Sequence, residues 1–169
     1  MNQGNHSESF QFSKIPANVS ELQALPEANL NSPYAAVALA MIALCGYKQN
    51  PGAVYEMLDF LNGPDEVSAY TKSFIKDRLE GKTYKPFSFF EGATVQNNYT
   101  PSEPFTIKVS ANPNSFIEEN WATLYVQSAG ADSPRPMKLR KKPSTGQWFV
   151  VDIQCLSDIR IPVAEDPWA

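Results

Sequence analysis

The feature that most constrains the fold is an unbroken apolar segment, YAAVALAMIALC, at residues 34–45. A helix formed by this segment has no polar face, so other elements must cover most of its sides. About a dozen residues are too few to span a bilayer, which needs roughly 20. We therefore expect a helix buried in the core of the protein.

Helix start and stop signals surround this segment and recur twice after it. An acceptor side chain precedes each predicted helix, at Ser32, Asn50 and Ser68, where it can cap the free N–H groups of the first turn. Glycine, which tolerates a positive φ angle, marks the end of each one. The signals predict three helices, over residues 33–46, 51–62 and 69–80.

Beyond residue 83 the apolar spacing changes from helical to alternating, as in Phe105, Ile107 and Val109. The alternation predicts four strands, at about residues 104–110, 121–128, 136–142 and 147–154. A short loop that contains glycine joins the last two as a hairpin. Because the helices precede the strands, we expect an α+β domain with three N-terminal helices packed on a C-terminal four-stranded antiparallel sheet.

The chain length of 169 residues favours one domain, which we place at residues 28–169. Residues 1–27 are polar and interrupted by Pro16 and Pro26. We expect them to form an N-terminal segment that is either mobile or docked on the body of the domain.

Composition limits the class of function. Apolar residues make up 43% of the chain, which is enough for a core, and the net charge is −4. An acidic chain argues against a general nucleic-acid or membrane-surface binder, so we expect neither partner. The first residues contain no apolar run of the secretory kind, and two cysteines are too few for a disulfide framework. A cytoplasmic protein is therefore expected.

The residues that most enzymes and metal sites need are scarce. His6 is the single histidine, and it lies in the polar N-terminal segment, away from any motif. Cys45 and Cys155 have no base beside them in sequence and are read as buried thiols. CxxC, P-loop and GxGxxG motifs are missing from the sequence. We therefore predict no catalytic residue, no metal site and no cofactor.

If the four strands form a meander, alternate loops lie at the same end of the sheet. One end then gathers residues 97–104, 130–136 and 155–162. Carboxylates beside guanidinium groups can bind an anionic ligand or shift pKa values for acid–base chemistry. The predicted ligand- or partner-binding residues are Asn97, Asn98, Tyr99, Asp132, Arg135, Asp158 and Arg160. The same charged groups can instead pair with one another and fix the loops in place.

The opposite end of the sheet, about 20 Å away, carries the basic residues Lys138, Arg140, Lys141 and Lys142. This run could bind a phosphate or an acidic partner. It is also typical of a solvated strand face, where lysine discourages aggregation.

A third unusual segment, KPFSFFEGATVQNNYTP at residues 85–101, surrounds Glu91 with aromatic residues. A carboxylate among aromatic rings can have a raised pKa and act as a general acid. If the rings instead pack between helices and sheet, Glu91 points to solvent.

Five segments together resemble an uncharacterised bacterial domain family of unknown function. They are LNGPDEVS (61–68), FSFFEGATVQNNYTP (87–101), GADSPR (130–135), LRKKPSTGQWF (139–149) and DIRIPVAEDPWA (158–169). The resemblance covers the chain from about Leu25 onward. It implies a family but no activity, cofactor or catalytic residue.

A second resemblance is architectural. Helices followed by a curved antiparallel sheet that ends in LRKKPSTGQWFVVDI are similar to the last hairpin of nuclear-transport-factor-2-like domains, which often form a cone with a pocket. Here three predicted helices precede all the strands, where that family interleaves them, and its pocket Asp/His pair is not evident. Its enzyme function is therefore not carried over.

The function of the chain stays unknown at this level, and three hypotheses remain. The first is a non-catalytic cytoplasmic domain that binds a protein or a small ligand through the loops around Asp132, Arg135, Asp158 and Arg160. The second is a pocket enzyme, a hydrolase or isomerase, that uses carboxylates such as Glu91 or Asp132 in a cavity between helices and sheet. The third is a structural assembly domain with a large apolar interface.

Overall fold

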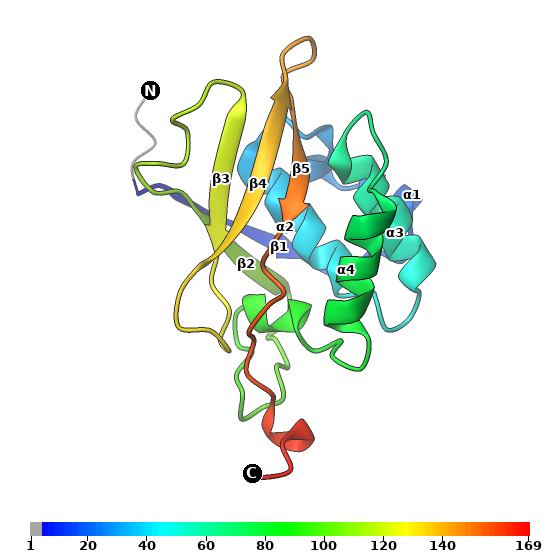
Figure 1. Cartoon of the computed structure of the whole chain (residues 1–169), viewed down its shortest axis with the longest axis vertical. Helices are drawn as coiled ribbons and strands as arrows, with labels where there is room; N and C mark the ends of the chain where they lie inside the picture. Colours follow the sequence, from blue (N-terminus) through cyan, green and yellow to red (C-terminus); the bar gives the residue numbers. More distant parts are fainter. Residues whose placement is uncertain (1–4) are drawn as a thin grey trace.

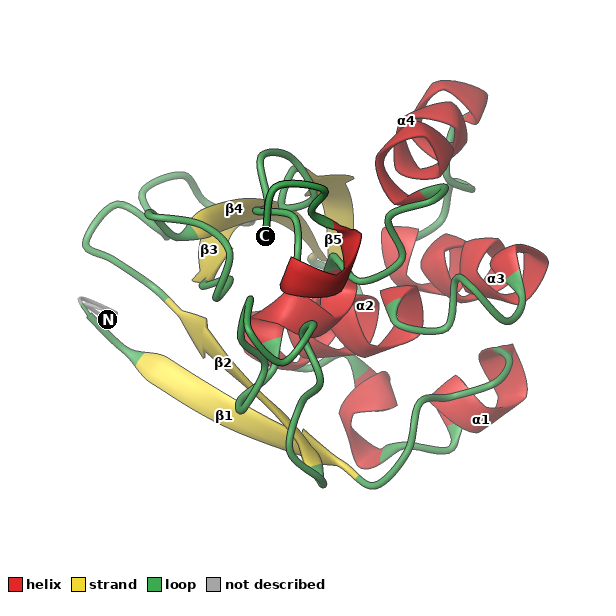
Figure 2. Ribbon diagram, turned by 90° about the horizontal axis from the view of Figure 1, so that it is seen from below, coloured by secondary structure: helices red, strands yellow, loops and turns green. Residues whose placement is uncertain are grey.

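The computed structural model describes residues 5–169. At its centre lies helix α2 (Pro33–Leu44), which the apolar segment forms. No residue from Tyr34 to Leu44 is more than 5% exposed. The antiparallel sheet curls around one side of α2, and the other helices cover the opposite side (Figures 1 and 2). The expectation of a buried core helix is confirmed.

Further helices and five strands surround α2. The other helices are α1 (Val19–Gln23), α3 (Pro51–Asn62) and α4 (Ala69–Leu79), with short 3-10 helices η1 (Pro26–Asn29), η2 (Pro86–Phe89) and η3 (Val163–Glu165). The strands are β1 (Ser7–Phe12), β2 (Phe105–Ser110), β3 (Trp121–Val126), β4 (Arg135–Lys142) and β5 (Gln147–Ile153). Helix α2 contacts α3, η1, η2 and four of the five strands.

The predicted capping residues hold the helix starts. The side chains of Ser32, Asn50 and Ser68 each accept a hydrogen bond from a backbone N–H in the first turn that follows. Gly63 ends α3 with φ of 113°, a conformation that favours glycine. All three predicted helices and all four predicted strands are present, and each begins and ends within two residues of its expected range.

The α+β class and the antiparallel sheet are as expected, but the count of three helices on a four-stranded sheet was incomplete. Residues 5–169 form a five-stranded meander in the order β1-β2-β3-β4-β5, and four α-helices. The extra strand, β1, and the extra helix, α1, come from the segment that we expected to be a polar tail, whose residues 1–4 lie outside the described residues. Strand β1 pairs with β2 from Ser7 opposite Ser110 to Phe12 opposite Phe105.

Two irregularities give the sheet its curl. Strands β2 and β3 pair only at Val109–Val126 and Ser110–Tyr125, and then diverge. In β5, a bulge opposite Lys138 and Leu139 lets Val150 and Ile153, three residues apart, both face the core. The apolar run WFVVDI, with apolar residues on both faces, is explained by this bulge.

We predict that Phe12 anchors β1 to the core. Phe12 is buried whereas its neighbour Gln11 is exposed. Phe12→Ala should lower the free energy of unfolding by about 3 kcal/mol or more because it leaves a cavity. Gln11→Ala should change it by no more than about 0.5 kcal/mol. Urea denaturation measures both, and equal small effects would contradict the docking of β1.

Candidate functional site

The seven residues predicted as a binding site do meet at one end of the sheet. The hydroxyl of Tyr99 donates to the carbonyl of Arg160 at 2.7 Å, and the N–H of Arg160 donates to the carbonyl of Gly130 at 2.9 Å. Three loops that are distant in sequence are thereby joined. The meander topology placed these residues together correctly.

Asn97 and Asn98 use their side chains to shape and anchor their own loop. The Asn97 Oδ1 accepts from the N–H groups of Thr94 and Thr100, at 2.8 and 3.0 Å. The Asn98 Oδ1 accepts from the N–H of Ala164 at 2.8 Å, which ties the C-terminal segment to this loop. Asn98 has φ of 59°, a conformation that asparagine adopts more readily than most residues. Both amides are therefore committed to backbone groups.

Tyr99 lies in the core of this loop cluster. Its side chain is 2% exposed, and its ring stacks on Tyr84 with 5.8 Å between centroids. Burial raises the pKa of Tyr99, so the hydroxyl stays protonated and continues to donate to Arg160. A Cβ at Gly130 would collide with the Tyr99 hydroxyl, which explains the glycine. Tyr99 is a structural residue in this geometry.

The charged residues of the set also hold loops. Arg135 donates from Nη2 to the carbonyl of Asp158 at 3.1 Å and from Nη1 to the hydroxyl of Ser133 at 3.2 Å. Its Nε is buried and has no hydrogen-bond partner within residues 5–169. Arg160 and Asp132 form an ion pair at the surface, where the Asp132 side chain is 91% exposed.

Three cations fix one segment, Leu156–Asp158, from different sides. Besides Arg135, Lys85 donates from Nζ to the carbonyl of Leu156 at 2.9 Å, and Arg78 donates from Nε to the hydroxyl of Ser157 at 3.2 Å. Lys85 is only 6% exposed, and burial lowers its pKa, with repulsion from Lys82 and Arg78 as further causes. We call this arrangement the cationic clamp; it consists of Lys85, Arg78, Arg135 and the segment they hold.

The enzyme hypothesis needs a carboxylate that is held away from solvent in a cavity. Within residues 5–169, no aspartate or glutamate side chain is buried. Glu91 borders a cavity of about 320 Å³ beside Lys108 and Tyr125, but it is exposed to solvent. The aromatic rings of Phe89 and Phe90 pack into the core instead of around the carboxylate.

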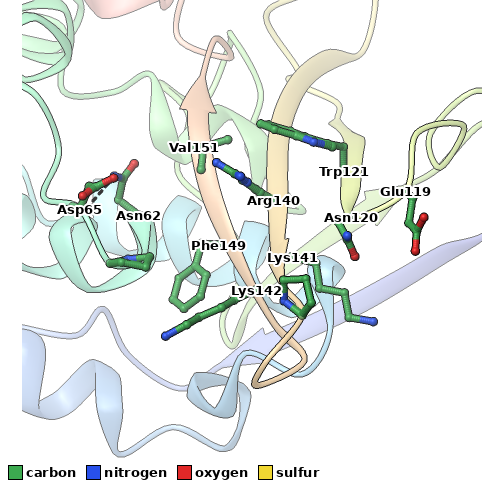
Figure 3. A pocket seen from close by; sticks show the side chains of 12 residues that line it. Asn62, Asp65, Glu119, Asn120, Trp121, Arg140, Lys141, Lys142, Phe149 and Val151 are labelled. Carbon is green, nitrogen blue, oxygen red and sulfur yellow. Dashed lines mark hydrogen bonds between the residues drawn. The ribbon is translucent and has the colours of Figure 1, made fainter.

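A groove of about 560 Å³ lies at the other end of the sheet, on the face of β4 and β5 that points away from α2 (Figure 3). Arg140, Phe149 and Val151 form its floor. One wall is the α3–α4 connection at residues 62–65, and the other is the start of β3 at residues 119–121. The groove therefore joins side chains from three separate parts of the chain.

Gly63 allows the first wall to close against the sheet. A Cβ at this position would lie 3.1 Å from Cγ of Phe149, which is tighter than an ordinary contact. Its φ of 113° would strain any other residue as well. Only glycine brings the α3–α4 connection onto the Phe149 ring without a shift in the neighbouring groups.

The floor of the groove presents cations on aromatic rings. The Arg140 guanidinium carbon lies 5.0 Å from the Trp121 ring centroid, and the Lys138 Nζ lies 4.9 Å from it. Such contacts are electrostatically favourable but leave N–H donors unused. Within the described residues, the side chains of Arg140 and Lys142 have no hydrogen bond and no ion pair. We call this site the basic groove, defined by Trp121, Arg140, Lys142 and Phe149.

The sequence had indicated the basic run on β4 but not the groove. The register places Trp121 opposite Arg140 and Arg140 opposite Phe149, so all three share the outer face of the sheet. The alternation of these residues was visible in the sequence. The wall at residues 62–65 was not, because it depends on where the α3–α4 connection packs.

Comparison with known families identifies the family of the chain. A family model described as a domain of unknown function, DUF6935, matches residues 14–163. This match covers most of the chain, so the protein belongs to that family. The resemblance to an uncharacterised family of unknown function is thereby confirmed, whereas the likeness to nuclear-transport-factor-2-like domains stays a prediction. The searches of curated proteins and of solved structures found no match.

Within residues 5–169, no three histidine, cysteine, aspartate or glutamate side chains lie close enough to hold a metal ion together. In the same range, none of the helices combines the length and apolar character that crossing a membrane requires.

We predict that Arg135 and Arg160 differ in their contribution to stability. Arg135→Met removes the charged donors to Asp158 and Ser133 from a partly buried side chain and should lower the free energy of unfolding by about 1–3 kcal/mol. Arg160→Met breaks an exposed ion pair and should cost less than about 1 kcal/mol. Chemical denaturation of both variants measures the difference. Equal costs would mean that the clamp does not depend on Arg135.

Lys85 gives the clamp a pH dependence. Because burial lowers its pKa below the ordinary 10.5, the unfolded chain binds more protons than the folded chain between the two values, and stability contributed by this site rises with pH. We predict that the free energy of unfolding of the wild type, minus that of Lys85→Met, increases as the pH is raised from neutral towards 10.5. Titration of tyrosines and cysteines is common to both proteins and cancels. A difference that stays constant with pH would show that Lys85 is not desolvated.

Proposed function

We propose that the protein is a non-catalytic binding domain and that the basic groove binds an anionic group of a protein or small-molecule partner. The observation that carries the proposal is that the Arg140 guanidinium lines a groove and its N–H donors have no hydrogen-bond partner within residues 5–169. The guanidinium also lies over the Trp121 ring. A guanidinium in this state matches a carboxylate or phosphate, which it can bind through two parallel hydrogen bonds.

The groove also offers apolar surface beside the charge. Trp121 and Phe149 line it together with Val151. Rings next to an unpaired cation favour a ligand that carries an aromatic or other apolar group near its negative charge. Asp65 and Glu119 lie on the two walls and oppose a highly charged polyanion such as nucleic acid, in agreement with the net charge of −4.

The residues predicted as a site at the opposite end of the sheet differ from Arg140, because their polar groups already have partners. Asn97, Asn98, Tyr99 and Arg135 already bind backbone groups, and Arg160 is paired with Asp132. Their use as a contact surface stays a prediction, as does the cytoplasmic location. No observation favours the pocket enzyme, because a carboxylate mechanism needs a desolvated carboxylate that residues 5–169 do not supply.

We predict that phenyl phosphate binds the groove more tightly than inorganic phosphate, because it uses both the cation and the rings. Benzyl alcohol, which lacks the anion, should bind more weakly still. Arg140→Ala should weaken phenyl phosphate binding about tenfold, a loss of ~1.4 kcal/mol. Isothermal titration calorimetry and thermal shift measure these affinities.

Two control variants locate the site. Lys48→Ala removes an exposed lysine on the α2–α3 connection and should leave the affinity unchanged. Arg160→Ala removes an exposed arginine at the sheet-end loops and should also leave it unchanged. If Arg160→Ala abolishes binding while Arg140→Ala does not, the sheet-end loops are the site and the groove proposal is wrong.

A further inference from the structure

The C-terminal segment, Val163–Trp168, is held by hydrogen bonds of its backbone, and most of its side chains are exposed. The N–H of Val163 donates to the carbonyl of Val95 at 3.1 Å, and that of Ala164 donates to Asn98 Oδ1. The N–H of Trp168 donates to Asp166 Oδ1 at 2.8 Å, which fixes the turn. Trp168 is nevertheless 93% exposed. Tryptophan is enriched among the residues that contribute most to binding at protein interfaces, so this exposed indole is a candidate contact residue.

This segment has the chemistry that the basic groove would recognise. It carries Glu165 and Asp166 beside Trp168, so negative charge and a large ring lie close together. The groove presents Arg140, Lys141 and Lys142 beside Trp121 and Phe149, and these cations outnumber the two wall carboxylates, Asp65 and Glu119. The two surfaces are therefore complementary in both charge and apolar character.

The segment cannot reach the groove of its own chain. It is bound to the loop at residues 95–98, at the end of the sheet opposite the hairpin that carries Lys142 (Figure 1). A second copy of the chain has no such restriction. We infer that the acidic segment Val163–Trp168 of one copy docks in the basic groove of a second copy, an inference that rests on the proposed function of the groove.

The geometry of this contact has a consequence for assembly. The segment and the groove are different surfaces, so the contact is head-to-tail and each copy keeps one free end. Such a contact extends into a chain of copies or closes into a ring, the smallest of which is a pair that exchanges both segments. A contact of one short segment is also small, so the association is weak and, because charges are involved, sensitive to salt.

The test is sedimentation velocity of the full chain over a range of concentrations at low salt. The wild type should grow in mass above the monomer with concentration and return towards the monomer as salt is added. Arg140→Glu, which keeps the segment but reverses the groove charge, should stay monomeric. Trp168→Ala, which keeps the groove but removes the indole, should stay monomeric as well.

A mixture of the two variants gives the sharpest result. Arg140→Glu supplies an intact segment and Trp168→Ala an intact groove, so together they should form a one-to-one pair that cannot extend. Lys48→Glu and Tyr70→Ala are the matched controls, a charge reversal and the loss of an exposed ring elsewhere, and should assemble like the wild type. Thermal unfolding confirms that all four variants fold.

Three outcomes would overturn the inference: a wild type that stays monomeric at every concentration, an Arg140→Glu variant that still assembles, or variants that do not pair on mixing. The proposed function is judged separately by phenyl phosphate. If phenyl phosphate binds in an Arg140-dependent way and the wild type stays monomeric, the groove binds anions but the occupant is not a second copy. If neither occurs, both proposals are wrong.

Discussion

The burial of α2 on all sides is the constraint on which the rest of the structure depends. An apolar helix of this kind needs a cover larger than any single layer can supply, so the sheet curls around it and α1, α3 and η1 close the opposite side. The divergence of β2 and β3 and the bulge in β5 are the local means by which the sheet curves. The N-terminal strand β1 completes the cover, with Phe12 in the same core as α2.

The two ends of the sheet differ in whether their polar side chains have hydrogen-bond partners. At one end the polar groups satisfy one another: the cationic clamp holds Leu156–Asp158, and Asn97 and Asn98 hold the adjacent loop. At the other end, the side chains of Arg140 and Lys142 have no hydrogen bond or ion pair within residues 5–169, and they border an open groove. We therefore interpret the first end as structural, and we propose the second as the binding site.

Much of this could be predicted from the sequence, because the signals are local. Caps such as Ser32 and Asn50 set the helix starts, alternation set the strands, and the meander alone gathered the sheet-end residues correctly. Strand β1 was missed because it depends on pairing with β2, about a hundred residues away, and on the burial of Phe12 against the core. The groove was missed because its wall depends on Gly63 packing against Phe149, a contact that no local pattern encodes.

The central claim is that binding takes place at the basic groove and not at the sheet-end loops. The most direct test is a titration of isotope-labelled protein with phenyl phosphate, followed by amide and indole chemical shifts in NMR spectra. The account predicts the largest changes at the Trp121 indole and at the amides of Gly63, Arg140 and Phe149, with residues 97–99 and 130–135 unaffected. Changes concentrated at residues 97–99 and 130–135, with the groove signals unmoved, would contradict it.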